Sequence, residues 1–154
     1  LTYTANPYPY ATKLIKHIQK HLNKKVVILD ETGRYWLDFK YKSFRSYGPR
    51  EIINLFKNAS FIISSSFHGA AFSVNFQKDF YSLFPKGVKD ERQESLLKLI
   101  GAENRFIHVG DPLPSPSAFE IQNWEQISEK LNAYRRYSIK YLTTALENAT
   151  KLTK

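Results

Sequence analysis

A short polar segment between two apolar runs carries the residue types that could do chemistry. The segment combines three hydroxyl groups, one imidazole and two small residues: Ser64, Ser65, Ser66, His68, Gly69 and Ala70. An imidazole can donate or accept a proton near neutral pH, and hydroxyl and backbone N–H groups can bind anions. The combination favours a site for a phosphate or a carboxylate.

The apolar runs on either side predict a strand before this segment and a helix after it. The unpaired N–H groups of a first helical turn and the positive end of the helix dipole both attract an anion. A plainer interpretation is that the serines cap the helix and that His68 is a partly buried histidine bonded to a carbonyl. The residue types alone leave both interpretations open.

Amphipathic helices alternate with short apolar strands along most of the chain. Periodicity predicts helices at 10–22, 49–58, 67–76 and 90–100, and strands at 1–4, 26–29, 61–63, 80–84 and 106–109. This alternation predicts an α/β fold with a doubly wound, mostly parallel sheet. Ligands in such sheets bind beyond the carboxyl ends of the strands, which is where the serine and histidine segment should lie.

Two stretches depart from the alternation. Residues 30–47 form a basic, aromatic loop with room for a short strand, and its part from Tyr35 to Tyr47 could contact sugars or be ordinary surface. Residues 110–117 are a proline-rich connector, which leads into one long helix or two joined helices between 124 and 146. We therefore expect a single domain over 1–154, with a C-terminal helical extension at 118–154.

Composition sets limits without choosing a ligand. A formal net charge of +9 should attract anions of any kind, and a hydrophobic fraction of 42% is enough for a folded core. The chain has no cysteine, so disulfides and thiolate metal sites are ruled out. Because it also has no methionine and begins on a strand-like segment, we expect it to be a fragment of a longer protein.

The remaining histidines do not predict a metal site. His17, His21 and His108 have no carboxylate or second histidine at the spacing that metal ligands require, so we expect surface or sheet-edge positions, no metal and no cofactor. The glycine-rich dinucleotide and P-loop patterns, the nucleophile elbow and the zinc-protease pattern are all missing. Their absence disfavours the corresponding enzyme classes.

A longer ordered pattern surrounds the serine and histidine segment. The series 48–59, 61–76 and 79–81 resembles the signature block of the polysaccharide pyruvyl transferases. Arg92, the residues 95–101 and Arg105 extend this resemblance, which covers roughly 50–105 well and the flanks loosely. The chain differs from many members at Ser65, where they have aspartate, and from others at Ser66, where they have arginine.

The resemblance implies a specific bacterial enzyme. Family members are similar to two-lobed GT-B-type enzymes, and the pattern lies in the Rossmann-like C-terminal lobe, so the N-terminal lobe would be the missing partner and this lobe alone should be inactive. They transfer a pyruvyl group from phosphoenolpyruvate to a surface polysaccharide or exopolysaccharide sugar as a ketal. We expect the enzyme to act in the cytoplasm, or at the inner face of the membrane where its acceptor is lipid-linked. We expect it to bind no nucleic acid.

The same resemblance assigns roles to residues. His68 corresponds to the histidine linked to donor binding and acid catalysis. The candidate donor-binding residues lie around it and on nearby basic positions: Ser64, Ser65, Ser66, Gly69, Ala70, Arg45, Arg50 and Arg92. For the three arginines, solvated surface charge is the alternative.

Two other functions fit part of the pattern. A sugar-nucleotide-dependent glycosyltransferase of GT-B type also holds a phosphorylated donor at helix N-termini, and the identity of the bound donor separates it from a pyruvyl transferase. A non-enzymatic basic module could bind acidic polysaccharide or nucleic acid. The basic residues, however, are scattered through amphipathic helices and form no stripe with interleaved aromatics, which disfavours that module.

Overall fold

Within the part of the chain that the structure describes, six short strands form one sheet in the order β3-β2-β1-β4-β5-β6. The computed structural model describes residues 2–3, 9–29, 42–44, 47–87 and 90–152. The strands are β1 (Thr2–Tyr3), β2 (Val27–Leu29), β3 (Lys42–Phe44), β4 (Ile62–Ser64), β5 (Phe80–Phe84) and β6 (Phe106–His108). Every pairing between described strands is parallel, so the prediction of an α/β fold with a parallel sheet is confirmed.

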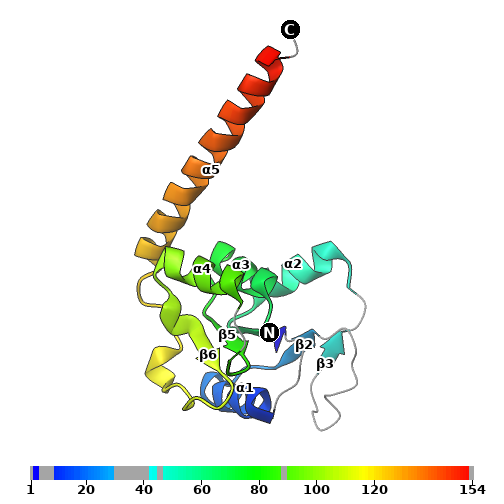
Figure 1. Cartoon of the computed structure of the whole chain (residues 1–154). Coiled ribbons are helices and arrows are strands. Elements are labelled where there is room, and N and C mark those ends of the chain that lie inside the picture. Colours follow the sequence, from blue (N-terminus) through cyan, green and yellow to red (C-terminus); the bar gives the residue numbers. More distant parts are fainter. Residues whose placement is uncertain (1, 4–8, 30–41, 45–46, 88–89, 153–154) are drawn as a thin grey trace.

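Helices connect the strands and cover both faces of the sheet. They are α1 (Pro9–Leu22), α2 (Pro49–Asn58), α3 (Phe67–Asn75), α4 (Glu91–Ile100) and α5 (Trp124–Leu152), with short 3-10 turns at Glu103–Arg105 and Pro116–Ala118. In Figure 1, α1 lies below the sheet, whereas α2, α3 and α4 lie together above it. The first four helices begin and end within one residue of the positions that the periodicity predicts.

Side chains that alternate along the strands build a separate core on each face. Ile63, Tyr81 and Leu83 point towards α1, where they pack with Leu14 and Ile15. The neighbouring strand positions point the other way and pack with the opposite helices, through Ile62, Phe80, Ala70, Val74 and Leu97. Strands that are buried on both faces account for the nearly unbroken apolar runs in the sequence.

The structure refines two details of the sequence-based expectation. The short strand for which the predicted loop at 30–47 had room is β3, which pairs with β2 from Val27↔Lys42 to Leu29↔Phe44. Residues 30–41, 45 and 46, which include most of the aromatic stretch and Arg45, lie outside the described residues. The strand predicted at 61–63 is shifted by one position, so Ser64 is its last residue rather than part of the following loop.

A buried arginine attaches the proline-rich connector to the sheet. Arg105 donates from Nη1 to the carbonyl oxygens of Ala118 and Phe119, both at 2.9 Å, and from Nη2 to that of Glu120 at 3.0 Å. The Tyr81 hydroxyl donates to the same Ala118 oxygen at 2.7 Å. These bonds fix the path of the chain just before α5.

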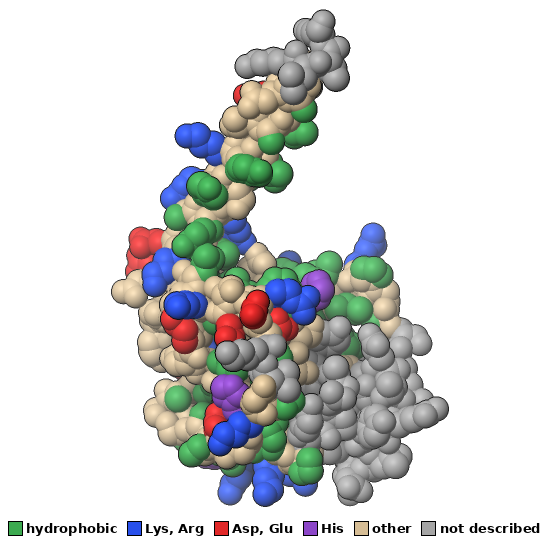
Figure 2. All heavy atoms as spheres, in the orientation of Figure 1, with side chains coloured by type: hydrophobic (Ala, Val, Ile, Leu, Met, Phe, Trp, Pro, Cys, Tyr) green, Lys and Arg blue, Asp and Glu red, His purple; other side chains and the backbone are tan. Residues whose placement is uncertain are grey.

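The last helix is continuous and extends well beyond the sheet. Its first turns pack against α4, and Ile127 is only 1% exposed. Arg135 still bonds to Asn75 of α3, and beyond it the helix projects away from the rest of the chain, with hydrophobic side chains visible along its length (Figures 1 and 2). Its exposed large apolar residues are Tyr134, Tyr137, Ile139, Tyr141, Leu142 and Leu146. The pattern in 124–146 thus forms one helix, not two.

Across the described ranges, no helix combines the length and the apolar character that crossing a bilayer would require.

Candidate functional site

The serine and histidine segment lies at the carboxyl edge of the parallel sheet. Strand β4 ends at Ser64, and α3 begins three residues later at Phe67. The register places Ser64 beside Tyr3 of β1 on one side and beside Ser82 of β5 on the other. The segment therefore occupies the edge at which parallel α/β sheets bind ligands.

Ser64 shapes the turn that leads into α3. Its side chain is buried, and its Oγ accepts the Ser66 N–H at 3.0 Å. The same hydroxyl is 3.4 Å from the Ser66 carbonyl oxygen, to which it can donate. Ser66 is the N-cap of α3 but makes no side-chain capping bond. The hydroxyl of Ser64 is thus engaged within the turn, whereas the half-buried Ser66 hydroxyl does not serve as a helix cap.

The first turn of α3 presents backbone donors beside this turn. The N–H groups of residues 67–69 have no carbonyl partner inside an α-helix, because the chain that would supply it lies outside the helix. The Ala70 N–H, by contrast, donates to the Ser66 carbonyl at 3.1 Å. Gly69 is buried, and its carbonyl accepts the Ser73 hydroxyl at 2.7 Å. Among the predicted backbone donors, Gly69 is therefore better placed for a ligand than Ala70.

His68 is exposed on the first turn of α3. Its ring contacts the Phe67 ring, with centroids 5.7 Å apart and planes inclined at 71°. No hydrogen bond to any described residue fixes the imidazole, so the plainer interpretation of a partly buried histidine bonded to a carbonyl does not fit. An exposed imidazole beside free helix donors can exchange a proton with a bound anion.

Helix α4 brings Arg92 to the same place. Asp90 caps α4 by accepting the N–H groups of Arg92 at 3.1 Å and Gln93 at 3.4 Å. Its carboxylate also pairs with Arg92 Nε at 3.3 Å. The guanidinium carbon lies 5.7 Å from the centroid of the Phe67 ring. Phe67 therefore contacts both His68 and Arg92, and two cationic side chains flank the start of α3 when the imidazole is protonated.

The other predicted residues are placed less closely. Ser65 is half-buried in the turn. Arg50 is exposed in the first turn of α2, and no contact joins it to the serine turn within the described part of the chain. Arg45 lies outside that part. The structure thus brings Arg92, but not Arg50, to the ring of Phe67, which His68 also contacts.

Two buried polar residues beside the site were not predicted. Ser82 and Gln93 are both 0% exposed. Within the described part of the chain, the Ser82 hydroxyl and both amide atoms of Gln93 have no hydrogen-bond partner. Two features of the sequence could have signalled them: Ser82 interrupts an apolar strand, and Gln93 follows Asp90 at the spacing of a capping box.

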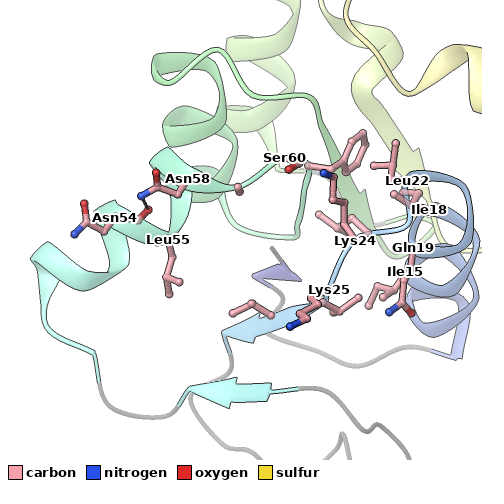
Figure 3. A pocket seen from close by; sticks show the side chains of 15 residues that line it. Ile15, Ile18, Gln19, Leu22, Lys24, Lys25, Asn54, Leu55, Asn58 and Ser60 are labelled. Carbon is pink, nitrogen blue, oxygen red and sulfur yellow. Dashed lines mark hydrogen bonds between the residues drawn. The ribbon is translucent and has the colours of Figure 1, made fainter.

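A cavity of about 360 Å³ lies away from this site. Figure 3 shows its walls, which come from the last turns of α1 and α2 and from the chain entering β2; they include Ile15, Ile18, Leu22, Lys24, Lys25, Asn54, Leu55 and Asn58. These segments meet at the amino edge of the sheet, opposite to Ser64 and His68. The cavity is largely apolar and is not where a parallel sheet binds anions.

The other histidines make local contacts. His17 Nε2 lies 2.8 Å from the Pro114 carbonyl oxygen, and His21 Nδ1 lies 2.8 Å from that of His17. His108 Nδ1 is 3.6 Å from an Asp111 carboxylate oxygen. Among the residues that the structure describes, no group of three histidine, aspartate or glutamate side chains is arranged to hold a metal ion.

Comparison with known families identifies the chain. The family model for polysaccharide pyruvyl transferase matches residues 2–83, which is more than half of the sequence. The chain belongs to the polysaccharide pyruvyl transferase family. No match was found among curated proteins or among solved structures.

The extent of the family match bears on the site of this pyruvyl transferase chain. The match includes β1 to β4, the serine turn, all of α3 and most of β5. It reaches further towards the N-terminus than the resemblance at 50–105, and it ends before Arg92 and Arg105. Membership of this transferase family thus rests on the half of the chain that contains His68.

Proposed function

We propose that this chain forms the donor-binding site of an enzyme that transfers a pyruvyl group from phosphoenolpyruvate to a polysaccharide sugar as a cyclic ketal. The observation that carries the proposal is the position of His68, exposed on the first turn of α3 and next to Phe67, which Arg92 also contacts. The strand order, which is that of a Rossmann-type sheet, supports a role as the C-terminal lobe of a GT-B-type enzyme.

The donor phosphate would bind at the start of α3. Backbone N–H groups of residues 67–69, the helix dipole and the Ser66 hydroxyl all favour a negative charge there. Arg92 adds a formal positive charge at the same end of the helix, and its side chain is 71% exposed and free to turn towards a ligand. Asp90 holds the guanidinium along one edge only, which leaves other N–H groups for an anionic group of the donor.

His68 would act as the general acid. In its protonated form it gives a proton to the methylene carbon of phosphoenolpyruvate, and the adjacent carbon becomes cation-like. A sugar hydroxyl attacks that carbon and loses its proton, which restores the imidazolium. The C–O bond to phosphate then breaks with its electron pair. A second hydroxyl of the sugar closes the ring on the same carbon, and its proton leaves with the phosphate.

Replacing His68 by Asn tests this role in the complete enzyme. We expect ketal formation to fall by roughly 10²–10⁴-fold, which is the usual contribution of a general acid, without a change in the far-ultraviolet circular dichroism spectrum. The matched control is His21→Asn, because His21 is an exposed histidine on α1, which covers the opposite face of the sheet. Wild-type rates in the His68 variant would rule out the acid role.

Donor identity separates this function from the two alternatives. Calorimetric titration with phosphoenolpyruvate and with several nucleotide sugars should give binding of phosphoenolpyruvate. Binding of nucleotide sugars alone would identify a glycosyltransferase instead. A mobility-shift titration with nucleic acid at moderate salt should show no complex, whereas a stable complex would favour a basic binding module.

A further inference from the structure

Three buried polar atoms beside the proposed donor site have no hydrogen-bond partner among the residues that the structure describes. They are the Ser82 hydroxyl oxygen and the two amide atoms of Gln93, and both residues are 0% exposed. A buried polar group without a partner loses its bonds to water and gains nothing in return. Such groups are rare in folded proteins, and a ligand or an ordered water often accounts for them.

The side chain of Gln93 does not take its usual local partner. Asp90 is the N-cap of α4 and accepts the Gln93 N–H, which is one half of a capping box. In a complete capping box the glutamine side chain returns to the N-cap N–H. Here it turns inward on the buried face of α4, which it shares with Leu97 and Ile100. Its amide is therefore available to something other than the helix.

The directions of α4 and β5 place Gln93 and Ser82 on the same face of the sheet and towards the same edge. Leu97 of α4 and Phe80 of β5 belong to the same core cluster. Gln93 precedes Leu97 by four residues, or about 6 Å along a helix. Ser82 follows Phe80 by two residues, or about 7 Å along a strand, and points to the same face. Because α4 runs back across the parallel strands, both steps lead to the carboxyl edge, where Ser64 pairs with Ser82.

We propose that the Gln93 amide and the Ser82 hydroxyl form the inner wall of the donor site and bind the carboxylate of the donor. This inference rests on the proposed function. Phosphoenolpyruvate carries two anionic groups, a phosphate and a carboxylate, and the proposed function places the phosphate at the first turn of α3. Gln93 Nε2 and the Ser82 hydroxyl are donors that suit a carboxylate, and the adjacent Arg92 supplies the charge.

The donor carboxylate would reach Gln93 and Ser82 by passing between Arg92 and Phe67. The contact between these two side chains joins the first turns of α3 and α4 at the surface, while the next residue, Gln93, lies on the inner side of α4. The donor carboxylate would separate the two side chains and then be covered by the guanidinium. Such surface contacts between a cation and a ring are weak, so a multiply charged ligand can displace them.

The test compares two anions that differ in the carboxylate. Dissociation constants for phosphoenolpyruvate and for inorganic phosphate would be measured by calorimetry on wild-type protein and on Gln93→Leu. Loss of a hydrogen bond to a charged group should weaken phosphoenolpyruvate binding by about 10- to 100-fold. Phosphate binding should change less than about 2-fold, since phosphate uses α3. Ser82→Ala should show the same selective loss, and the exposed Gln122→Leu is the matched control.

Stability gives an independent readout. Because Gln93 has no partner to lose, Gln93→Leu and the more flexible Gln93→Met should not lower the thermal unfolding midpoint. Unchanged phosphoenolpyruvate affinity in both Gln93 variants would overturn the inference, as would an equal loss for both anions. Wild-type protein that binds phosphate but not phosphoenolpyruvate would instead overturn the proposed function, and this inference with it.

Discussion

Arg105 and Ala118 are joined by a hydrogen bond of 2.9 Å from Nη1 to the main-chain oxygen. The same guanidinium bonds to the two following carbonyls, and Arg105 is only 4% exposed. Arg105→Leu would leave these buried oxygens without their donor and should lower the free energy of unfolding by about 3 kcal/mol. Urea denaturation measures this loss. The exposed Arg50→Leu should change it by less than about 0.5 kcal/mol, and equal effects would contradict the assignment.

Tyr81 is buried and Tyr10 half-buried, and the two should respond differently to loss of their hydroxyl groups. The Tyr81 hydroxyl donates to the Ala118 oxygen, whereas the buried Tyr10 hydroxyl has no hydrogen-bond partner among the described residues. Tyr81→Phe should destabilise the fold by about 1 kcal/mol, while Tyr10→Phe should be neutral or stabilising. Chemical denaturation of the two variants, side by side, would reveal the difference. A greater loss in the Tyr10 variant would contradict the hydrogen-bond assignment.

Alkaline pH should weaken the fold through the same tyrosines. Burial raises the pKa of Tyr81 and of Tyr10 above the ordinary value of 10.0, and the nearby Arg105 only partly opposes this for Tyr81. Above that value the unfolded chain releases these protons first, so stability is complete below about pH 10 and falls as pH rises through the folded-state pKa. The variant with both tyrosines changed to Phe should lose less stability between about pH 9 and pH 11. Urea midpoints measured across this range are the check, and parallel curves would contradict it.

Asp90 should contribute through its cap on α4. It accepts the N–H groups of Arg92 and Gln93, so Asp90→Ala should cost about 1 kcal/mol of unfolding free energy. Asn accepts the same bonds, and Asp90→Asn should retain most of that stability. Thermal unfolding of both variants provides the comparison. If the Asn variant were as unstable as the Ala variant, the ion pair with Arg92 would outweigh the cap.

Substitutions along α5 should show where its contribution to stability ends. Ile127→Ala removes a side chain that is 1% exposed and should cost about 2–4 kcal/mol. Leu142→Ala, on the projecting part of the same helix at 58% exposed, should cost less than about 1 kcal/mol. Both free energies come from urea titrations of the protein. A large loss at Leu142 would mean that something in solution covers this part of the helix.

The elements with strong local patterns could be predicted with their bounds, whereas for one edge strand the sequence indicated only a loop with room for it. The apolar runs of β2, β4 and β5 and the periodic faces of α1 and α4 reflect burial that the sequence itself encodes. Strand β3 has the sequence Lys42-Ser43-Phe44 and a single neighbour, so its pairing with β2 leaves no local signal. In α5, periodicity predicted the helix but not that its apolar positions beyond Leu131 would be exposed.

The place of the serine and histidine segment in the fold could be predicted, but the partners of its residues could not. A strand, a serine turn and a helix start in sequence are enough to place His68 at the carboxyl edge of the sheet. The contact of Arg92 with Phe67 depends on how α4 packs beside α3. The burial of Ser82 and Gln93 depends on the same packing. Such contacts between distant residues follow from tertiary structure, and local spacing does not reveal them.

Arg105 recognises residues 118–120 by their carbonyl oxygens, which every amino acid carries. The side chains of Ala118 and Glu120 are exposed, so other residues can replace them in homologues without loss of these hydrogen bonds. The ring of Phe119, by contrast, is buried in the core. The family match ends at residue 83, ahead of this region. Homologues should accordingly keep an arginine at the position of Arg105 and an aromatic residue at that of Phe119, while the residues around them vary.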